Sequence, residues 1–408
     1  MGSSWYPSEE LPTLELACPM HLKAFWRDVR FLQILAQVLF VVVLAAAAGF
    51  LYANVSTNLS RQGLTVGLGF LRNPANFDIG EQAIPYQPSN SYGRAILVGL
   101  MNTLSVSAWG IVLATIVGVI AGVARLSTNW LVNKFAATYV GVIRNTPLII
   151  QLMFWYFGII LQLPGVRDAF SIPGPIFLSN RGLYLPWPLG TETLPSWLPF
   201  WGVAFSLVVL FRLFFWALEK RMDRPIPFWW QPLAYLVMPG IVLWAGAALL
   251  PVPPLAVSLP RLSGLNFAGG LRLTPEFAAL LFGLVTYTGA FIAEVVRAGI
   301  QSVSRGQAEA ARSLGLPPGL LMRLVIFPQA LRLIIPPLTS QYLNLAKNSS
   351  LAIAIGYPDL FSVAGTVFNQ TGAAVEIILI MMISYLMMSL FTSLLMNIYN
   401  SRTRLVER

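Results

Sequence analysis

Residues 94–123 read RAILVGLMNTLSVSAWGIVLATIVGVIAGV, a stretch with no charge after Arg94. A helix crosses the hydrocarbon core of a bilayer with about 20 apolar residues, so this stretch is long enough to span a membrane. Similar apolar stretches lie near 32–53, 136–162, 199–218, 229–250, 276–298, 332–355 and 372–399, the last but one interrupted by Pro336, Pro337 and Lys347. The sequence therefore predicts an all-α polytopic membrane protein with about eight transmembrane helices.

The composition agrees with a membrane protein. Only 10% of the 408 residues are charged and 56% are hydrophobic, with a mean hydropathy of +0.70. A soluble domain carries about 25% charged residues, so the composition excludes a soluble globular enzyme and equally a disordered chain. One cysteine, Cys18, and one histidine, His21, exclude an internal disulfide and argue against a metal or haem site, so no cofactor is expected in this chain.

The basic residues predict the orientation. The net charge is +10, and the Lys and Arg residues lie between apolar runs, which indicates membrane topology rather than nucleic-acid binding. With the N-terminus inside, 16 of them fall in cytoplasmic segments and 7 in external loops. This excess predicts cytoplasmic ends at 1–31 and 402–408 and an external loop at 54–93. The first residues carry Glu9, Glu10 and Glu15 rather than a basic stretch, and the first apolar run is too long for a cleavable segment, which predicts a retained first helix at 32–53 and no signal peptide.

Two further stretches suit packing or surface contact. Gly110, Ala114, Gly118 and Gly122 recur every four residues, which predicts a helix face that a second helix approaches closely. The external loop 163–198 is rich in Pro and Trp. Its Trp residues either anchor the loop at the lipid headgroups or contact a soluble partner.

The longest cytoplasmic loop, residues 303–328, is predicted to form two short helices. Ser304 can cap the first helix with Gln307 as its reciprocal partner, and Gly315 suits the end of that helix. Pro317 or Pro318 suits the first turn of the next helix. The loop has an apolar face made of Leu314, Leu316, Leu320, Leu321 and Leu324. Such a pair either receives a protein partner or lies on the lipid surface as an amphipathic hairpin.

This loop also carries a family resemblance. Glu309-Ala310-Ala311, then Gly315 and Val325-Ile326-Phe327-Pro328, is similar to the EAA loop of permease subunits of bacterial ATP-binding-cassette importers. Arg144-Asn145-Thr146-Pro147-Leu148 with Gln151, Tyr287 to Ile300, and Lys347-Asn348-Ser349-Ser350-Leu351 resemble segments of the polar amino-acid permeases in that family. We refer to residues 303–328 as the EAA loop.

The resemblance covers 91–163 and 272–401 and implies a five-helix permease core. Residues 164–271 are then an insertion with an external Pro/Trp-rich loop and two helices, which resembles the enlarged permeases of general or neutral amino-acid uptake systems. The chain has no G-x-x-x-x-G-K-S/T phosphate loop. It cannot power transport itself in that way, and the resemblance implies a transporter subunit rather than an enzyme, multi-pass in the bacterial inner membrane.

The resemblance also implies the partners. ATP would be hydrolysed by a separate pair of ATPase subunits, a second and similar permease chain would complete the path, and a periplasmic or lipid-anchored binding protein would deliver the amino acid. No nucleic-acid partner is implied, and lipid surrounds the helices. The residues that would contact the ATPase are Glu309, Ala310, Ala311, Gly315 and Pro328.

Polar groups inside the apolar stretches are candidates for the substrate path, because such groups are costly in a membrane. They are Asn102, Thr103, Arg144, Asn145, Thr146, Gln151, Tyr287, Glu294, Lys347, Asn348 and Ser349. Arg144 could instead reach the cytoplasmic surface, Glu294 could simply pair with Arg297, and the run around Lys347 could bind a zwitterion or seal against the second permease. The path stretches offer no acidic cluster, which favours neutral or broadly polar L-amino acids over Arg or Lys.

Three alternatives remain open from the sequence. An ion-coupled secondary transporter or channel would carry inverted repeats, and no convincing repeat is present. A membrane enzyme would need a constellation of His, Cys and carboxylate residues, which the sequence lacks. The same importer architecture could also serve another small polar solute.

Overall fold

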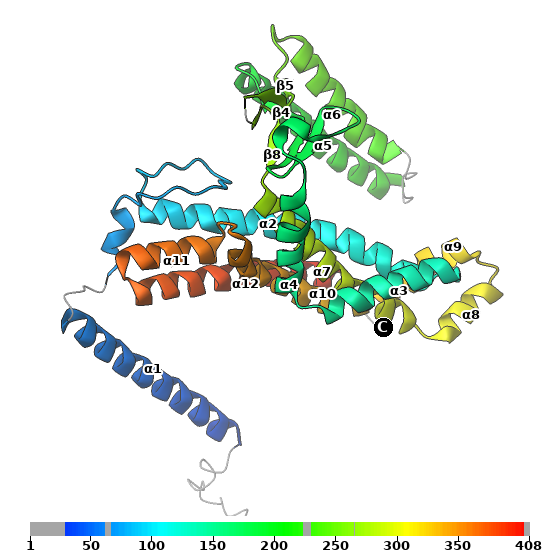
Figure 1. Ribbon diagram of the computed structural model, residues 1–408. Coiled ribbons are helices and arrows are strands. Elements are labelled where there is room, and N and C mark those ends of the chain that lie inside the picture. Colours follow the sequence, from blue (N-terminus) through cyan, green and yellow to red (C-terminus); the bar gives the residue numbers. More distant parts are fainter. Residues whose placement is uncertain (1–28, 62–66, 223–229, 265, 404–408) are drawn as a thin grey trace, which may run out of the picture. The chain divides into compact units, whose positions relative to one another are not determined.

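A computed structural model describes residues 29–61, 67–222, 230–264 and 266–403 of the chain (Figure 1). The chain divides into one unit up to Leu68 and a second from Gly69 onward. The first contains a single long helix, α1 (Val29–Arg61), whose apolar part, Phe31–Leu51, is long enough to cross a membrane. The predicted terminal segments lie largely outside the described residues, including Cys18 and His21.

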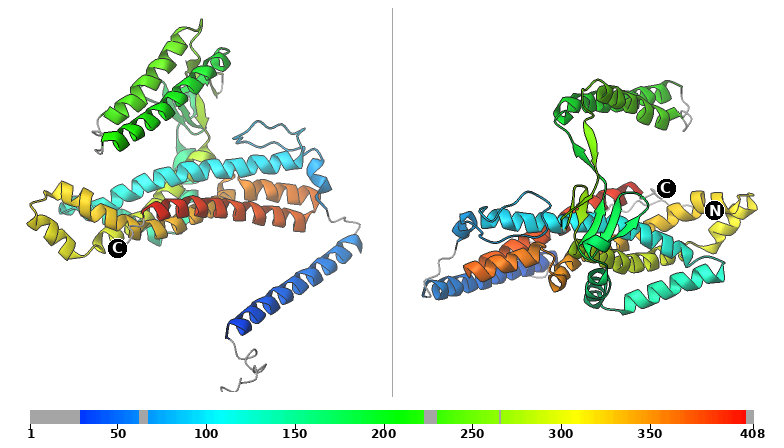
Figure 2. Two further views of the ribbon diagram at one scale, coloured as in Figure 1. Left: turned by 180° about the vertical axis from the view of Figure 1, so that it is seen from behind. Right: turned by 45° about the horizontal axis from the view of Figure 1, so that its top comes forward.

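Five helices form the centre of the second unit. They are α2 (Tyr92–Ala124), α7 (Pro275–Gln301), α10 (Phe327–Asn348), α11 (Leu360–Thr371) and α12 (Ala374–Thr403). Helix α7 packs on α2 and α10, and α11 packs on α2 and α12 (Figures 1 and 2). Leu280, Leu284 and Ile292 of α7 are fully buried in the core that this packing creates. Sequence periodicity did not predict α11, which has only 12 residues.

The small residues of α2 lie where helices meet, as the sequence predicts. A methyl group at Gly118 would approach the Cβ of Ile292 to 2.5 Å, and one at Gly122 would approach the backbone oxygen of Ala293 to 2.7 Å. Closer to the start of α2, Gly110 faces Leu345 of α10. The predicted close approach is confirmed, because α7 occupies space that any side chain on this face would need.

The structure supports six spans rather than a clear eight. In the described part of the chain, six helices are long and apolar enough to cross a membrane, and two shorter apolar helices, Leu148–Gln162 and Tyr235–Ala248, fall where two more are predicted. The second of these belongs to α6 (Trp230–Ala248), which packs against α5 (Leu194–Met222). The chain is thus predominantly helical, and the count of eight spans is not confirmed.

The prediction of one helix over 136–162 is wrong. Helix α3 (Trp130–Asn145) ends before Pro147, and α4 (Leu148–Met153) begins after it, followed by a π-helical turn, Phe154–Ile159, and a 3-10 turn, Ile160–Gln162. A proline disfavours helical backbone at the residue before it and has no N–H to donate. Thr146 is accordingly extended, with φ −104° and ψ 127°.

The EAA loop is helical, as predicted. Helix α8 (Arg305–Ser313) is followed by α9 (Pro318–Leu321) and a π-helical turn, Met322–Ile326, that runs directly into α10. Pro336 and Pro337 lie within α10 without ending it, and the chain continues from α10 as a 3-10 helix, Ser349–Ile355.

The prediction of an all-α fold is wrong for the insertion 164–271, where the described residues contain eight short strands after a 3-10 turn (Val166–Asp168). They are β1 (Phe170–Ile172), β2 (Ile176–Ser179), β3 (Gly182–Leu185), β4 (Trp187–Gly190), β5 (Leu255–Ser258), β6 (Arg261–Ser263), β7 (Asn266–Ala268) and β8 (Leu271–Leu273). Strands β1, β2, β3 and β8 form one antiparallel sheet, β4 pairs with β5, and β6 pairs with β7. Tight turns explain this structure, since Gly174 and Gly182 adopt φ of 100° and 119°.

Strand pairing joins the two ends of the insertion. Leu183 of β3 lies opposite Leu273 of β8, directly before α7, and Trp187 of β4 lies opposite Ser258 of β5. Because both ends meet in paired strands, α5 and α6 are inserted between α4 and α7 while those two helices stay in contact.

Candidate functional site

The break between α3 and α4 exposes backbone carbonyl groups that a continuous helix would use. Gln151 of α4 compensates for this loss. Its Nε2 donates to the carbonyl oxygens of Ile143 and Thr146, each at 2.9 Å, and its side chain is buried. Its Oε1 has no hydrogen-bond partner among the described residues. Gln151 therefore stabilises the end of α3, close to the predicted path residues Asn145 and Thr146 that form the break.

Arg144 and Tyr287 both contact the aromatic ring of Phe291, next to the helix break. The Arg144 guanidinium carbon lies 5.0 Å from the ring centre of Phe291 on α7. The Tyr287 ring is 5.0 Å from the same ring. Both contacts are favourable, a cation over the face of an aromatic ring and a tilted aromatic pair. Arg144 and its neighbour Asn145 are exposed, so a charged group and two aromatic rings border an open helix break.

Asn102 and Thr103 are placed differently, since both are fully buried and bonded within the chain. The Asn102 amide donates to the carbonyl oxygens of Glu81 and Pro358 at 2.8 and 2.9 Å and accepts from the Ala83 N–H at 2.9 Å. Thr103 Oγ1 accepts from the Leu360 N–H at 2.9 Å. These bonds use the hydrogen-bonding capacity of the Asn102 amide, and they connect α2 to the start of α11.

The polar run after α10 is divided between surface and core. Ser349 is buried and donates to the carbonyl oxygen of Ala346 at 2.9 Å. Lys347 is exposed in the last turn of α10, where the helix dipole favours a positive charge. Asn348 is partly buried and precedes the 3-10 helix.

Asp359 is a buried carboxylate that the sequence analysis missed. It lies between two candidate spans, and its Oδ1 accepts from the Ser362 N–H at 2.9 Å to cap α11. Tyr385 of α12 approaches its other oxygen to 3.5 Å. Burial raises the pKa of this carboxyl to about 6. The signal in the sequence is an N-cap pattern, Pro358-Asp359, ahead of an apolar run.

The raised pKa of Asp359 predicts a pH-dependent stability. The pKa of this carboxyl is near 3.8 in the unfolded chain and near 6 in the folded chain. The buried negative charge therefore lowers the free energy of unfolding: the loss is absent below pH 3.8, grows between pH 3.8 and 6, and is complete above about pH 6. We expect the thermal unfolding midpoint to rise between pH 7.5 and 5. The variant Asp359→Asn keeps the cap, and it should have a higher unfolding midpoint at pH 7.5 and a smaller rise of the midpoint at low pH. The rise that remains in the variant is due partly to Glu81, because burial raises the pKa of that carboxyl as well. If the midpoint changes equally with pH in the wild type and in Asp359→Asn, Asp359 is not the cause of the rise.

The EAA loop presents a small, mixed surface. Glu309 and Ala310 on α8 are exposed, whereas Ala311 is buried against its own loop. Leu314 is 82% exposed, and Pro328, in the first turn of α10, is also exposed. Leu320 and Leu324 of the same loop are exposed as well, and several exposed apolar side chains together make the loop a candidate contact surface.

Gly315 ends α8 as predicted. Its φ is 76°, its N–H donates to the carbonyl oxygen of Arg312 at 2.8 Å, and the Leu316 N–H donates to that of Ala311 at 3.2 Å. This is the usual glycine cap of a helix C-terminus. Pro318 opens α9, as expected. The predicted cap at the other end is wrong, since Ser304 occupies the N-cap position but its side chain makes no capping hydrogen bond.

Glu294 lies on α7 just ahead of the EAA loop. The predicted pair with Arg297 is confirmed, with Arg297 Nε 3.2 Å from each carboxylate oxygen. Arg125, directly after α2, binds the same carboxylate. The sequence could not reveal that second partner, because Arg125 and Glu294 are far apart along the chain.

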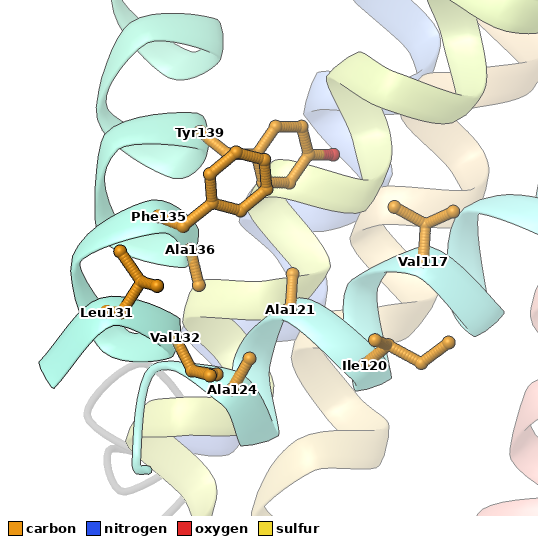
Figure 3. Close-up of a pocket in the computed structure, with 9 residues that line it drawn as sticks. All are labelled: Val117, Ile120, Ala121, Ala124, Leu131, Val132, Phe135, Ala136 and Tyr139. Atoms are coloured by element: carbon orange, nitrogen blue, oxygen red, sulfur yellow. The ribbon is translucent and has the colours of Figure 1, made fainter. Parts of the chain in front are cut away.

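A pocket of about 560 Å³ lies between the second half of α2 and the first half of α3 (Figure 3). Its lining is apolar apart from Tyr139, whose hydroxyl donates to the carbonyl oxygen of Thr286 at 2.7 Å. None of the predicted path residues lines it. The pocket therefore offers no free polar group to a polar solute.

Comparison with known proteins agrees with these features. A family model described as "binding-protein-dependent transport system inner membrane component" matches residues 114–405. The putative amino-acid ABC transporter permease protein YhdX of Escherichia coli (strain K12) is 50% identical over 92% of this chain and 94% of its own. AapQ of Rhizobium johnstonii, a general L-amino acid transport system permease protein, is 42% identical over 93% of this chain and 94% of its own.

A third relative, BztB of Rhodobacter capsulatus, is a glutamate/glutamine/aspartate/asparagine transport system permease protein. It is 39% identical over 93% of this chain and 96% of its own. These alignments include the insertion 164–271 because each covers more than nine-tenths of the chain. From the family match and the three relatives together, the chain belongs to the family of inner-membrane components of binding-protein-dependent transport systems.

Proposed function

We propose that this chain is the permease subunit of an ATP-driven importer of polar L-amino acids. Members of its family are membrane transport components rather than enzymes. The observation that carries the proposal is the EAA loop, with its exposed Glu309, Ala310 and Leu314 between α7 and α10. The names of the three relatives support amino acids as the substrate class, and two of them favour a broad range.

The partners follow from the same proposal. The EAA loop docks on a separate ATPase subunit, and a second, similar permease chain completes the translocation path. A periplasmic or lipid-anchored binding protein delivers the solute at the opposite face. The excess of Lys and Arg in alternate connections supports both termini, and the EAA loop, on the cytoplasmic side.

We assign the substrate path to the broken helix. The Arg144 guanidinium is the positive charge at the break, and it would pair with the α-carboxylate that every amino acid carries. Tyr287 and Phe291 form an aromatic wall beside it. Asn102 and Thr103 have a structural role in this proposal, because the chain itself uses their hydrogen-bonding groups. A contact with the shared α-carboxylate, rather than with a side chain, suits a broad range of substrates.

An uptake experiment tests the proposal and the role of Arg144. Cells that lack the chain are supplied with a radiolabelled mixture of L-glutamate, L-glutamine, L-aspartate and L-asparagine, and uptake is measured with and without the restored gene. Arg144→Met should lower initial uptake by roughly 10- to 100-fold, because a charge-assisted contact contributes about 1.5–3 kcal/mol. Arg144→Lys keeps the charge and should retain part of the activity.

Arg212→Met is the matched control, since Arg212 is an exposed arginine in helix α5 of the insertion. It should leave uptake within about twofold of wild type. Equal losses in both variants would indicate a general fault in membrane insertion and would remove the assignment of Arg144. Uptake that survives complete depletion of ATP but stops with the ion gradient would favour the alternative, an ion-coupled secondary transporter.

A further inference from the structure

A cluster of charges lies at the base of the EAA loop. Its centre is the Glu294 carboxylate on α7, which binds the Arg125 and Arg297 guanidinium groups. The three side chains are between 22% and 27% exposed, so water screens them only in part. A carboxylate shared by two arginines has a defined geometry, because each guanidinium donates in fixed directions.

The cluster joins the ends of three helices. Arg125 is the residue that follows α2, and its carbonyl oxygen accepts from the side chain of Asn133 on α3. On the other side, Arg297 also binds Gln301, the last residue of α7. Helix α8 begins at Arg305, only a short turn beyond. One carboxylate therefore connects α2 and α3 to the base of the EAA loop.

Helix α3 also bonds to α7 through the Tyr139 hydroxyl and the Thr286 carbonyl oxygen, but Thr286 lies farther from the loop along α7 than Glu294 does. Along the chain the loop joins only α7 and α10, and these two are in tight contact at its base, where a methyl group at Gly299 would approach Ile334 to 2.3 Å. The remaining contact of α2 with α7, around Gly118 and Gly122, is apolar. Apolar helix surfaces can slide past one another more readily than a geometrically fixed ion pair can stretch.

We propose that Glu294 is a positioning residue that transmits movement of the EAA loop to α2 and α3, and hence to the helix break at residues 145–148. The inference rests on the proposed function, and it identifies the contact that connects the two sites of that function, the EAA loop and the substrate path. When the loop moves, the Arg125–Glu294–Arg297 cluster makes the ends of α2 and α3 move with α7. Without the cluster, the loop moves while the path responds only in part.

The test uses the complete transporter, with its ATPase and second permease, in lipid nanodiscs. Cys18 is the single cysteine of this chain, so the Cys18→Ser chain, assembled with cysteine-free partner subunits, accepts two spin labels at exposed positions, Thr128 before α3 and Ser304 before α8. The distance between the labels is measured with and without ATP plus vanadate. In parallel, ATP-driven transport of the amino-acid mixture used above is measured in proteoliposomes per ATP hydrolysed.

In the wild type we expect one narrow distance distribution in both nucleotide states. Glu294→Gln should broaden or split it when ATP and vanadate are added, and should lower transport per ATP by about fivefold or more. Arg125→Gln should do the same, and the double variant should be no worse than either single one, because each variant breaks the Arg125–Glu294 ion pair that joins α2 to α7. Glu294→Asp, which keeps the charge, should recover part of the coupling.

The control is Glu192→Gln, which removes an exposed carboxylate in the insertion and should behave as wild type. Wild-type distances and wild-type transport per ATP in Glu294→Gln would overturn the inference while leaving the proposed function intact. If Glu294→Gln fails to assemble, the same result in Arg125→Gln decides the question. A wild-type complex that shows no ATP-driven transport contradicts the proposed function itself.

Discussion

Replacing Gly315 with valine is expected to separate the permease from its ATPase. Gly315 has φ of 76°, a backbone region that costs an ordinary L-residue roughly 1–2 kcal/mol and a β-branched one more. Space is not the obstacle, because a methyl group at this position would meet no atom within 4 Å. The valine would instead change the backbone φ at this position. Helix α9 would then follow α8 in another direction, and the side chain of Leu314 would be displaced.

The measurement is co-purification of the ATPase from native membranes in mild detergent. We expect Gly315→Val to lower the ATPase recovered per permease at least about tenfold, with a parallel loss of uptake. Gly315→Asn is the matched control, since asparagine tolerates this backbone region, and it should retain most of the ATPase. If valine and asparagine bind the ATPase equally well, the turn at Gly315 does not determine docking.

A leucine at Gly118 is expected to prevent the core from forming. The first side-chain carbon would lie 2.5 Å from the Cβ of Ile292 and 3.0 Å from the backbone oxygen of Gly289. Neither of these atoms is the movable end of a side chain, so α2 and α7 must separate. Overpacking commonly costs about 1–3 kcal/mol, and we expect about 3 kcal/mol or more here, because the Cβ of Ile292 cannot move aside without the backbone of α7.

Thermal unfolding in detergent and size-exclusion chromatography measure this effect. Gly118→Leu should yield mostly aggregated protein or a strongly lowered unfolding midpoint. Gly141→Leu on α3 is the matched control, because a side chain there meets nothing within 4 Å in this chain. A normal midpoint for Gly118→Leu would mean that α2 and α7 do not pack as closely as the structure describes.

The helix break illustrates how far local sequence carries a prediction. Pro147 and its effect on Thr146 are visible in the sequence, and yet 136–162 is apolar enough to suggest one span. Whether a proline bends a membrane helix or ends it depends on groups that satisfy the freed carbonyls. Gln151 does this here, and its choice of partners is a matter of folded geometry.

The insertion shows a different limit. Its strands are three or four residues long, and two of the pairings, β3 with β8 and β4 with β5, join segments more than 60 positions apart. Short apolar runs between glycines and prolines resemble loops when only neighbouring residues are considered. The all-α prediction failed there for that reason, because strand formation depends on the packing context of the folded chain more than on the intrinsic preference of such short runs.

The sequence by itself determined the features that arise from composition and local chemistry. These are the apolar stretches, the small face of α2, the glycine turn at the end of α8 and the pairing of Glu294 with Arg297, three residues apart. Each depends on residues close together along the chain, where spacing alone sets geometry. The resemblance in the EAA loop rests on the same kind of local pattern.

Only the tertiary structure decided which distant groups meet. It brings Arg125 to Glu294, Arg144 to Phe291, and Asn102 to the backbone before α11. It also distinguishes polar residues that are saturated, such as Asn102, from those left open, such as Arg144. The physical reason is that a membrane helix can satisfy a polar side chain through any neighbour at the same depth, and the packing of helices selects that neighbour.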